Sequence, residues 1–146
     1  MTTYADLRLR PHLDDAVAGY ERMQARIRAA LDRDLGPSGW RQLRAATPST
    51  GGHDVPAEFG ARTLALAPWG RSAPIPDPDW DRARRIVRRI AGEHGLTRPT
   101  DDLDVPGHHV LAVVDPVLGA TCTFGSRAMT VLQVVTGSHL PAATAP

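Results

Sequence analysis

The stretch PDWDRARRIVRRIAGEHG, residues 78–95, decides the fold class, because it encodes one strongly amphipathic helix. Its apolar residues recur at spacings of three and four, which places them on one face of a helix. They are Trp80, Ala83, Ile86, Val87, Ile90 and Ala91, and the rest of the helix carries Arg82, Arg84, Arg85, Arg88 and Arg89. Asp79 suits an N-cap and Gly95 suits a C-terminal cap. A helix with a single apolar face has to pack against another layer.

A second helix is predicted from Pro11 to Leu35. Its apolar side chains again share one stripe. They are Leu13, Val17, Tyr20, Ile27, Leu31 and Leu35. Acidic residues gather near its start and basic residues near its end, which matches the helix dipole. The pair Gly36-Pro37 ends the helix.

Short apolar segments separated by turn residues predict β-strands in the rest of the chain. The predicted strands are residues 40–46, 63–67, 109–114, 120–124 and 129–136. Residues 47–54 and 68–78 are rich in turn residues and are predicted to be loops. The last three strands follow one another through short turns, which is typical of an antiparallel meander.

This order of elements predicts an α+β fold. We expect a two-layer sandwich, in which two amphipathic helices cover one face of a mainly antiparallel sheet of about four to six strands. A chain of 146 residues suits one domain. We place this domain at residues 11–141, between a flexible N-terminus of residues 1–10 and a disordered tail of residues 142–146.

The charge composition argues against nucleic acid as a partner. The chain has 17 basic residues, all of them arginine, and 16 acidic ones, so its formal net charge is +1. Proteins that bind nucleic acid usually carry a clear basic excess, because they neutralise phosphates. The arginines of the helix at residues 78–95 are the one feature in favour of such binding, and this is the weakest hypothesis.

Cys122 is the only cysteine, so the chain cannot form an intramolecular disulfide. A reduced compartment tolerates such a lone cysteine, and this one, in an apolar strand, is expected in the core. The N-terminal MTTYADLRLRPHLDD lacks the apolar run of a signal peptide, and no segment approaches the roughly 20 apolar residues of a membrane helix. We therefore expect a cytoplasmic protein without a membrane span or a lipid anchor.

Three stretches of the sequence carry a family resemblance. They are IPDPDWDRARRIVRRIAGEHGL (residues 75–96), VLAVVDPVLGATCTFGS (residues 110–126) and TVLQVVTGSHLP (residues 130–141). From about Val17 to Pro141 the chain resembles the LppA-like lipoproteins of mycobacteria and related actinobacteria. The resemblance implies the same order of elements. It implies no chemistry, because the family has no established activity.

The chain departs from the pattern of that family in two ways. Family members typically begin with a signal peptide and a lipobox cysteine and are held at the envelope, and this sequence has neither. The resemblance also implies a cysteine pair between the loop at residues 47–54 and the position of Ser138, and both places lack cysteine here. The lipoprotein anchor is therefore not carried over.

Six histidines could suggest a metal site, but none shows a ligand spacing such as HxxxH or HExxH. They are His12, His53, His94, His108, His109 and His139. We expect no metal and no cofactor. His139 and Ser138, at the end of the last predicted strand, are weak candidates for catalysis. A site there would need Asp104 or Asp115 and a hydroxyl nearby.

Two pairs of residues are candidates for ligand binding. Trp40 and Trp69 lie in or beside predicted loops, where they either close the edge of the core or line a pocket. Arg85 and Arg89 stack at i, i+4 and could hold an acidic group, although such a charged face is more often only solvated.

The sequence favours a non-catalytic binding or interaction module, because it contains no nucleophile elbow, phosphate loop or metal motif. Its partner would be a protein or a small molecule. The alternative is a small His-dependent enzyme, similar to a hydrolase, with its site near the last strand.

Overall fold

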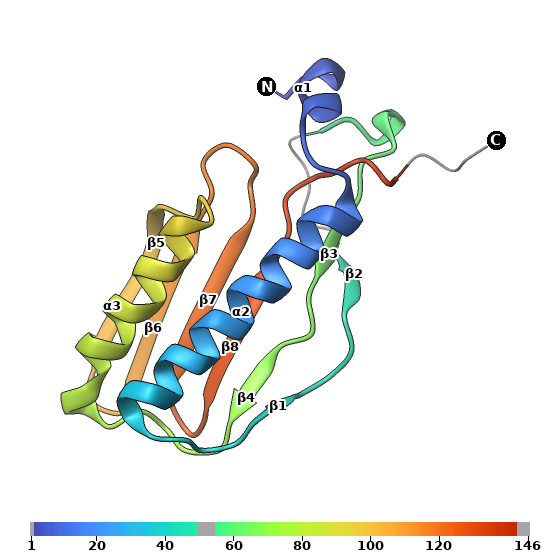
Figure 1. Cartoon of the computed structure of the whole chain (residues 1–146). Coiled ribbons are helices and arrows are strands. Elements are labelled where there is room, and N and C mark those ends of the chain that lie inside the picture. Colours follow the sequence, from blue (N-terminus) through green and yellow to red (C-terminus); the bar gives the residue numbers. More distant parts are fainter. Residues whose placement is uncertain (1, 50–54, 143–146) are drawn as a thin grey trace.

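An antiparallel sheet of eight strands forms one layer of the computed structural model, which describes residues 2–49 and 55–142 (Figure 1). The strands are β1 (Trp40–Gln42), β2 (Thr47–Ser49), β3 (Thr63–Ala65), β4 (Trp69–Arg71), β5 (Arg98–Val105), β6 (His108–Val114), β7 (Thr121–Ser126) and β8 (Thr130–Val135). Their order is β1-β4-β8-β7-β6-β5, and β3 pairs with both β2 and β8. The last strand of the chain therefore lies inside the sheet, between β4 and β7.

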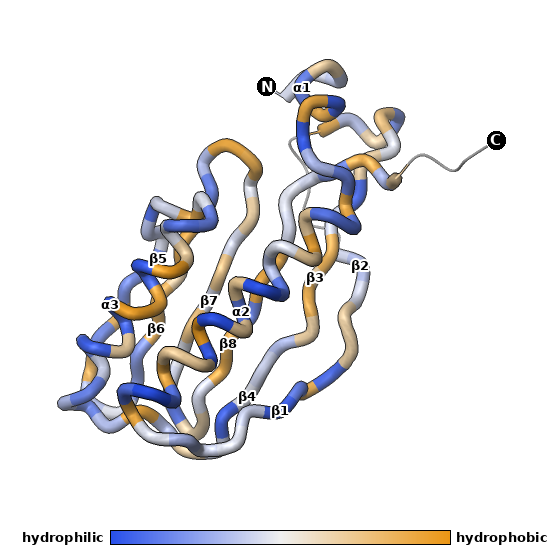
Figure 2. Tube along the Cα trace, viewed as in Figure 1, coloured by the Kyte–Doolittle hydropathy of each residue, from blue (hydrophilic) through white to orange (hydrophobic). Residues whose placement is uncertain are grey.

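Two long helices cover one face of this sheet, so the predicted two-layer α+β fold is confirmed (Figure 1). They are α2 (Leu13–Leu35) and α3 (Asp77–Glu93). The two helices pack against each other, with α2 over β8 and α3 over β6. Figure 2 shows hydrophilic and hydrophobic segments alternating along both helices, as their periodicity predicts. No helix in the described part of the chain is long and apolar enough to span a membrane.

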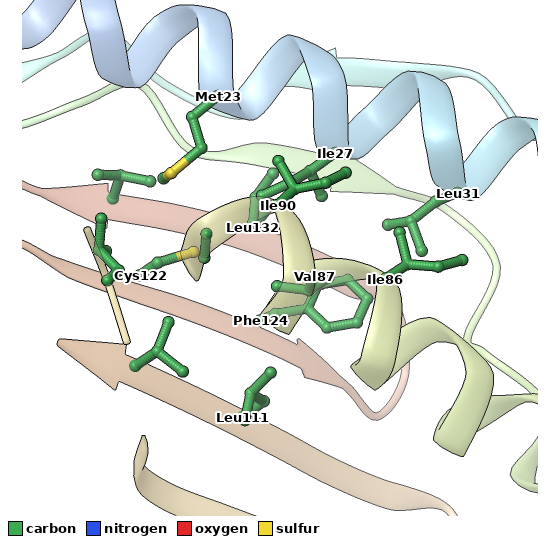
Figure 3. Packing of buried hydrophobic residues seen from close by; sticks show 14 of the residues in the cluster. Met23, Ile27, Leu31, Ile86, Val87, Ile90, Leu111, Cys122, Phe124 and Leu132 are labelled. Atoms are coloured by element: carbon green, nitrogen blue, oxygen red, sulfur yellow. The ribbon is translucent and has the colours of Figure 1, made fainter. Parts of the chain in front are cut away.

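The core lies between the helices and the sheet. In Figure 3, side chains of both helices point toward side chains of β6, β7 and β8. Trp80 is fully buried and stacks on Phe124, with ring centroids 5.3 Å apart. Cys122 packs in this core as predicted, and burial raises the pKa of its thiol to about 12. The thiol is therefore protonated and unreactive at neutral pH.

The sheet has eight strands instead of the four to six predicted, because β2 and β4 are short and lie in segments predicted to be loops, and β5 is polar. The sequence of β5, RPTDDLDV, has no apolar alternation, since this strand lies at the sheet edge and is almost wholly exposed. β4 lies in the segment predicted to be a loop. Its Gly70 signals a turn, but here the missing side chain leaves room for Leu43 and Met129, whose end carbons lie 2.6 Å from where a Cβ would be.

The N-terminal residues form a short helix, α1 (Tyr4–Leu9), where the sequence analysis expected a flexible segment. Thr3 and Asp6 form a capping box at its start. The ring of Tyr4 contacts Phe59 of the 3-10 helix η1 (Ala57–Phe59), with centroids 5.5 Å apart. Arg10 then donates to the carbonyl oxygens of Ser138 and Val117, at 2.9 and 3.1 Å. These contacts tie α1 to the body of the protein.

α3 begins at Asp77, two residues before the predicted N-cap Asp79. The difference arises because Pro78 is accepted within the first turn, where its missing N–H costs nothing. Residues 50–54 and 143–146, which include His53 and most of the predicted tail, lie outside the described residues.

Candidate ligand-binding site

Three polar residues lie on one side of α2: Glu21, Gln24 and Arg28. Their spacing of three and four residues places them on one stripe of the helix, which faces the β1–β4 end of the sheet. Gln24 is only 2% exposed, although its neighbours in the core are apolar. The sequence analysis did not single out this glutamine, because one amide in an amphipathic helix carries no spacing signal.

The guanidinium group of Arg28 lies over the ring of Trp69, with the guanidinium carbon 3.5 Å from the ring centroid. This distance is typical of a cation–π contact. Burial lowers the pKa of Arg28, and the nearby carboxylate of Asp32 offsets part of that shift. Arg28 forms no ion pair with any of the described residues. The arginine is thus held in place by an aromatic ring, and the carboxylate of Asp32 acts on its charge without forming an ion pair.

A cavity of about 380 Å³ lies between this side of α2 and the segments around β1 and β4. Its polar walls are Glu21, Gln24, Arg28 and Gln42, and its other walls are Ala45, Ala46, Leu66, Ala67 and Trp69. Such a volume suits a small molecule.

Two side chains that line this cavity each carry a buried hydrogen-bond donor without a partner in the described structure. Nε2 of Gln24 and Nε of Arg28 are both buried, and neither makes a hydrogen bond within the described structure. Most buried polar atoms in proteins are hydrogen-bonded, so each exception calls for an explanation. The three other atoms of this kind, on Arg71, Trp80 and His139, do not line the cavity. Two of the five unpartnered atoms found in the described structure therefore belong to side chains that line one small cavity.

Trp40 and Trp69 have different positions relative to this cavity. Trp69 forms one wall, whereas Trp40 packs against the core and donates from Nε1 to Asp32, at 3.0 Å. In the β1–β4 pairing, Trp69 lies opposite Gln42, and Trp40 lies opposite Arg71. The two rings are therefore on the helix side of the sheet, but they do not form a common pocket.

Arg85 and Arg89 are exposed residues of α3. This helix covers the β6 side of the sheet, whereas β1 and β4, which begin with Trp40 and Trp69, lie toward its other edge (Figure 1). Arg85 pairs with Asp81 at 2.8 Å, and both side chains are largely exposed. Two neighbouring arginines are also balanced, since Arg84 pairs with Asp102 and Arg82 with Asp79, whereas Arg88 and Arg89 are exposed and form no ion pair with a described residue. This face has the pattern of a solvated helix surface.

His139 is fully buried and its ring is fixed by one hydrogen bond. Nδ1 donates to the carbonyl oxygen of Pro11 at 2.8 Å, and Nε2 has no partner in the described chain. Burial lowers the pKa of His139, so the ring is neutral at pH 7. Ser138 lies in the wall of a second cavity of about 670 Å³, together with Leu13 and Arg62.

The two proposed partners of His139 have other contacts. The carboxylate of Asp104 binds Nδ1 of a different histidine, His109, at 2.9 Å. Asp115 accepts from the backbone N–H groups of Val117 and Leu118, at 2.8 and 3.0 Å, which forms the turn after β6. The structure therefore brings no carboxylate into hydrogen-bond contact with His139 among the described residues.

His109 forms a cluster that sequence reasoning missed. Its ring is 1% exposed and lies between two carboxylates, because Nε2 also contacts Asp77 at 2.7 Å. It stacks on Trp80 at 4.8 Å. The cluster joins the start of α3 to the β5–β6 hairpin. Asp77 and His109 are far apart in the sequence, so no motif spacing could have predicted their contact. No described group of three such side chains has the geometry of a metal site.

The fold defines a two-layer α+β domain with one polar cavity beside its first long helix. A family model described as LppA, a lipoprotein confined to pathogenic Mycobacterium, matches residues 2–142, and the chain belongs to this family. Because the model describes lipoproteins, the expected cytoplasmic location is not supported. The match also begins before the predicted domain start, at α1.

Two solved structures share the fold. The lipoprotein LppA from Mycobacterium tuberculosis aligns with a TM-score of 0.66 and 17% identity, over 98% of this chain and 90% of that chain. A DUF4853 family protein from Actinomyces odontolyticus aligns with a TM-score of 0.63 and 8% identity, over 95% of this chain and 74% of that one. No curated protein matches the sequence. At these identities the likeness concerns the fold alone.

Proposed function

We propose that this protein is a non-catalytic binding domain, and that its ligand occupies the cavity formed by Gln24, Arg28 and Trp69. The observation that carries the proposal is the pair of buried, unpartnered donors on Gln24 and Arg28. A buried donor without a partner costs about 1–3 kcal/mol, so these side chains would gain by turning toward acceptor oxygens of a ligand in the cavity.

The surroundings of these donors suit binding. Trp69 holds the Arg28 guanidinium against its ring, so little side-chain freedom remains to be lost when a ligand arrives. The polar walls consist of two amides, a guanidinium and a carboxylate, and the cavity lacks a paired nucleophile and base among its described walls. These groups recognise ligands, but they do not form a catalytic pair.

A thermal-shift screen with a metabolite panel tests this proposal. We expect at least one compound to raise the melting temperature of the wild-type protein, and to lose this effect in R28Q. The matched control is R89Q, because Arg89 is exposed on α3 and outside the cavity. A compound that stabilises wild type and R28Q equally but not R89Q would place binding on the arginine face of α3. That result would contradict the proposal.

A His-dependent enzyme is the second candidate, and one observation favours it. The neutral, unpartnered Nε2 of His139 has the protonation state of a general base. Its Nδ1 is already oriented by Pro11. H139N keeps a donor for this carbonyl group, and a hydrolase activity lost in folded H139N would support the enzyme. Unchanged turnover would exclude a role for His139.

We propose in addition that the protein works at the cell envelope. The support is the family description as a lipoprotein, since family members share the fold over nearly the whole chain. Fractionation of the native host tests this location. Recovery of the protein with the membrane or the exported fraction would agree with the proposal, and recovery only with the cytosol would overturn it.

A further inference from the structure

We infer that two copies of this chain pack together through the face of the sheet that the helices leave uncovered. Both long helices lie on the same side of the sheet, and no helix of the described chain packs on the other side (Figure 1). The ligand cavity lies beside α2, on the covered side. The inference therefore concerns a second surface and goes beyond the proposed function.

The uncovered face of the sheet is strongly apolar. In an antiparallel sheet with one face in water, apolar side chains toward the core normally alternate with polar side chains toward the solvent. In β6 and β8 the buried side chains alternate instead with apolar ones that are only half-buried. The apolar residues on the uncovered face of β5, β6 and β8 are Leu103, Val110, Ala112, Val114, Val131 and Val135. Such a patch is typical of a protein interaction surface.

A hollow lies near the middle of this face. The strand order β1-β4-β8-β7-β6-β5 has its midpoint between β7 and β8, where Gly125 pairs with Val131. A groove of about 380 Å³ lies over Gly125, with Val110 and Val131 among its walls. A two-fold axis that runs along the strands at this midpoint places β7 of one copy over β8 of the other. Val131 of each copy then lies over the hollow at Gly125 of the other copy.

The charges at the two edges of the face fit the same axis. Asp101 is on this face at the β5 edge, in register with Gln133 of β8. Arg41 is on it at the β1 edge, in register with Val131, and Arg44 donates to Oε1 of Gln133 at 3.1 Å. Asp101, Arg41 and Arg44 are exposed and form no ion pair with a described residue. The axis puts β5 of one copy over β1 of the other, so each Asp101 meets two arginines of opposite charge.

A two-fold axis across the strands fits less well. It would place β5 over β5, and the two Asp101 carboxylates would then approach each other. It would also bring the arginines at the two β1 edges together. Like charges that face each other across an interface cost free energy. Because either two-fold axis makes both copies contribute the same surface, the charge pattern is what selects the axis along the strands.

The size of the face suits a reversible dimer. With about 4.8 Å between strands and about 3.4 Å per residue, the strands from β5 to β1 have a footprint of about 500 Å². Two copies would therefore bury about 1,000 Å² in total, which is near the lower limit for specific interfaces. We expect a dissociation constant in the micromolar range.

Sedimentation equilibrium of the full chain, from micromolar to millimolar concentration, tests the dimer. We expect the wild-type protein to pass from monomer to dimer over this range. V131D should remain a monomer, because dimerisation would bury a carboxylate of each copy in the apolar hollow of the other. The matched control is R89D, because Arg89 is exposed on α3 in the helix layer. It should dimerise like the wild type.

Charge reversal tests the axis, and it keeps the test decisive if V131D folds poorly. D101R alone and the double variant R41D/R44D alone should each weaken self-association by about tenfold or more, because like charges then face each other. An equimolar mixture of the two variants should form a heterodimer, since every reversed charge then meets an opposite one. Circular dichroism checks that each variant is folded.

Three outcomes would overturn the inference. The first is a wild-type protein that stays monomeric at millimolar concentration. The second is a dimer that V131D and both charge reversals leave unchanged. The third is a failure of the mixed charge-reversed variants to form a heterodimer, which would contradict the axis along the strands. None of these outcomes bears on ligand binding beside α2, so the proposed function stands or fails separately.

Discussion

Gln24 is the residue where a stability cost and the proposed binding role coincide. Its side chain is buried on α2, yet its Nε2 has no hydrogen-bond partner in the described structure. A protein can keep such a group when function requires it, at the expense of stability. This cost lies in the free energy of unfolding, so a substitution of Gln24 can measure it.

We predict that Q24L stabilises the protein. Leucine is similar in size to glutamine and removes the unpartnered donor, so the free energy of unfolding should rise by about 1 kcal/mol. Urea unfolding followed by circular dichroism measures this change. The gain should come with loss of ligand binding in the cavity. A clear loss of stability in Q24L would show that the amide is hydrogen-bonded in solution, which would contradict the basis of the proposed function.

His139 gives a prediction about pH. Burial lowers its pKa from the ordinary value of 6.5, so the folded protein resists protonation and the unfolded chain does not. The stabilising contribution of the neutral ring is therefore complete above about pH 6.5 and declines as the pH falls below that value. H139N removes this titration and keeps a donor for the carbonyl oxygen of Pro11. The fall in stability between about pH 7 and 5 should be shallower in H139N.

Urea unfolding of both proteins across this pH range is the measurement. A smaller decline should remain in H139N, because burial also lowers the pKa of His94. Equal slopes in the two proteins would mean that the ring of His139 is accessible to protons in the folded state.

At this scale the sequence predicted residue types better than residue contacts. Cys122 was assigned to the core from its apolar surroundings, and that assignment is confirmed. His109 was taken as an isolated histidine, because its carboxylate partners Asp77 and Asp104 come from different elements. The contact between Arg28 and Trp69 also joins distant segments, and no local pattern marks it.

At the scale of elements, two glycines illustrate how context decides a substitution. Gly92 lies within α3, and a Cβ there would meet no atom within 4 Å. Gly137 follows β8, and a Cβ there would lie 1.7 Å from the carbonyl oxygen of Leu118. Gly137 is thus required by the close approach of two backbone segments.

We predict opposite effects for alanine at these two positions. G92A should raise the free energy of unfolding by about 0.5–1 kcal/mol, because glycine is a poor helix former. G137A should lower it by about 3 kcal/mol or more, because backbone atoms would have to move apart. Thermal or urea unfolding of G92A, G137A and the wild-type protein under the same conditions checks both predictions. A G137A protein as stable as wild type would contradict the close packing of residues 118 and 137.

Sequence patterns predicted the two long helices and only some of the short elements. α2 and α3 extend over several turns, so their apolar periodicity is unambiguous. β1 and β3 were predicted, each with extra residues at its end, whereas β2 and β4 were missed, because three residues are too few to show any alternation. α1 was missed for a similar reason, since its six residues bury only Leu7.

At the scale of the whole molecule, the layers were predictable and the strand order was not. Two helices with one apolar face each, and a meander of strands in which apolar residues alternate with others, allow few arrangements other than a two-layer sandwich. The pairing of β4 with β8 joins Gly70 to Val131, and nothing in either segment specifies the other. Such pairs are fixed by the packing of the complete chain.

We therefore predict that a chain ending at residue 129 does not fold. Without β8 it lacks the strand that pairs with β3, β4 and β7. Circular dichroism and proton NMR should show no cooperative unfolding and little dispersion of amide signals. A chain ending at residue 142 is the control and should fold like the full protein. A cooperative transition in the shorter chain would contradict the central role of β8.

The central position of β8 has a consequence for synthesis of the protein on the ribosome. All walls of the ligand cavity come from residues 21–69, which are translated early. Leu66, one of these walls, is held by the last strand, since its N–H donates to Val134 and its carbonyl oxygen accepts from Gln133, at 2.9 and 2.7 Å. A nascent chain thus carries every residue of the cavity long before the cavity can form. The ligand that we propose could be captured only after translation is nearly complete, so an unfinished chain would not compete for it.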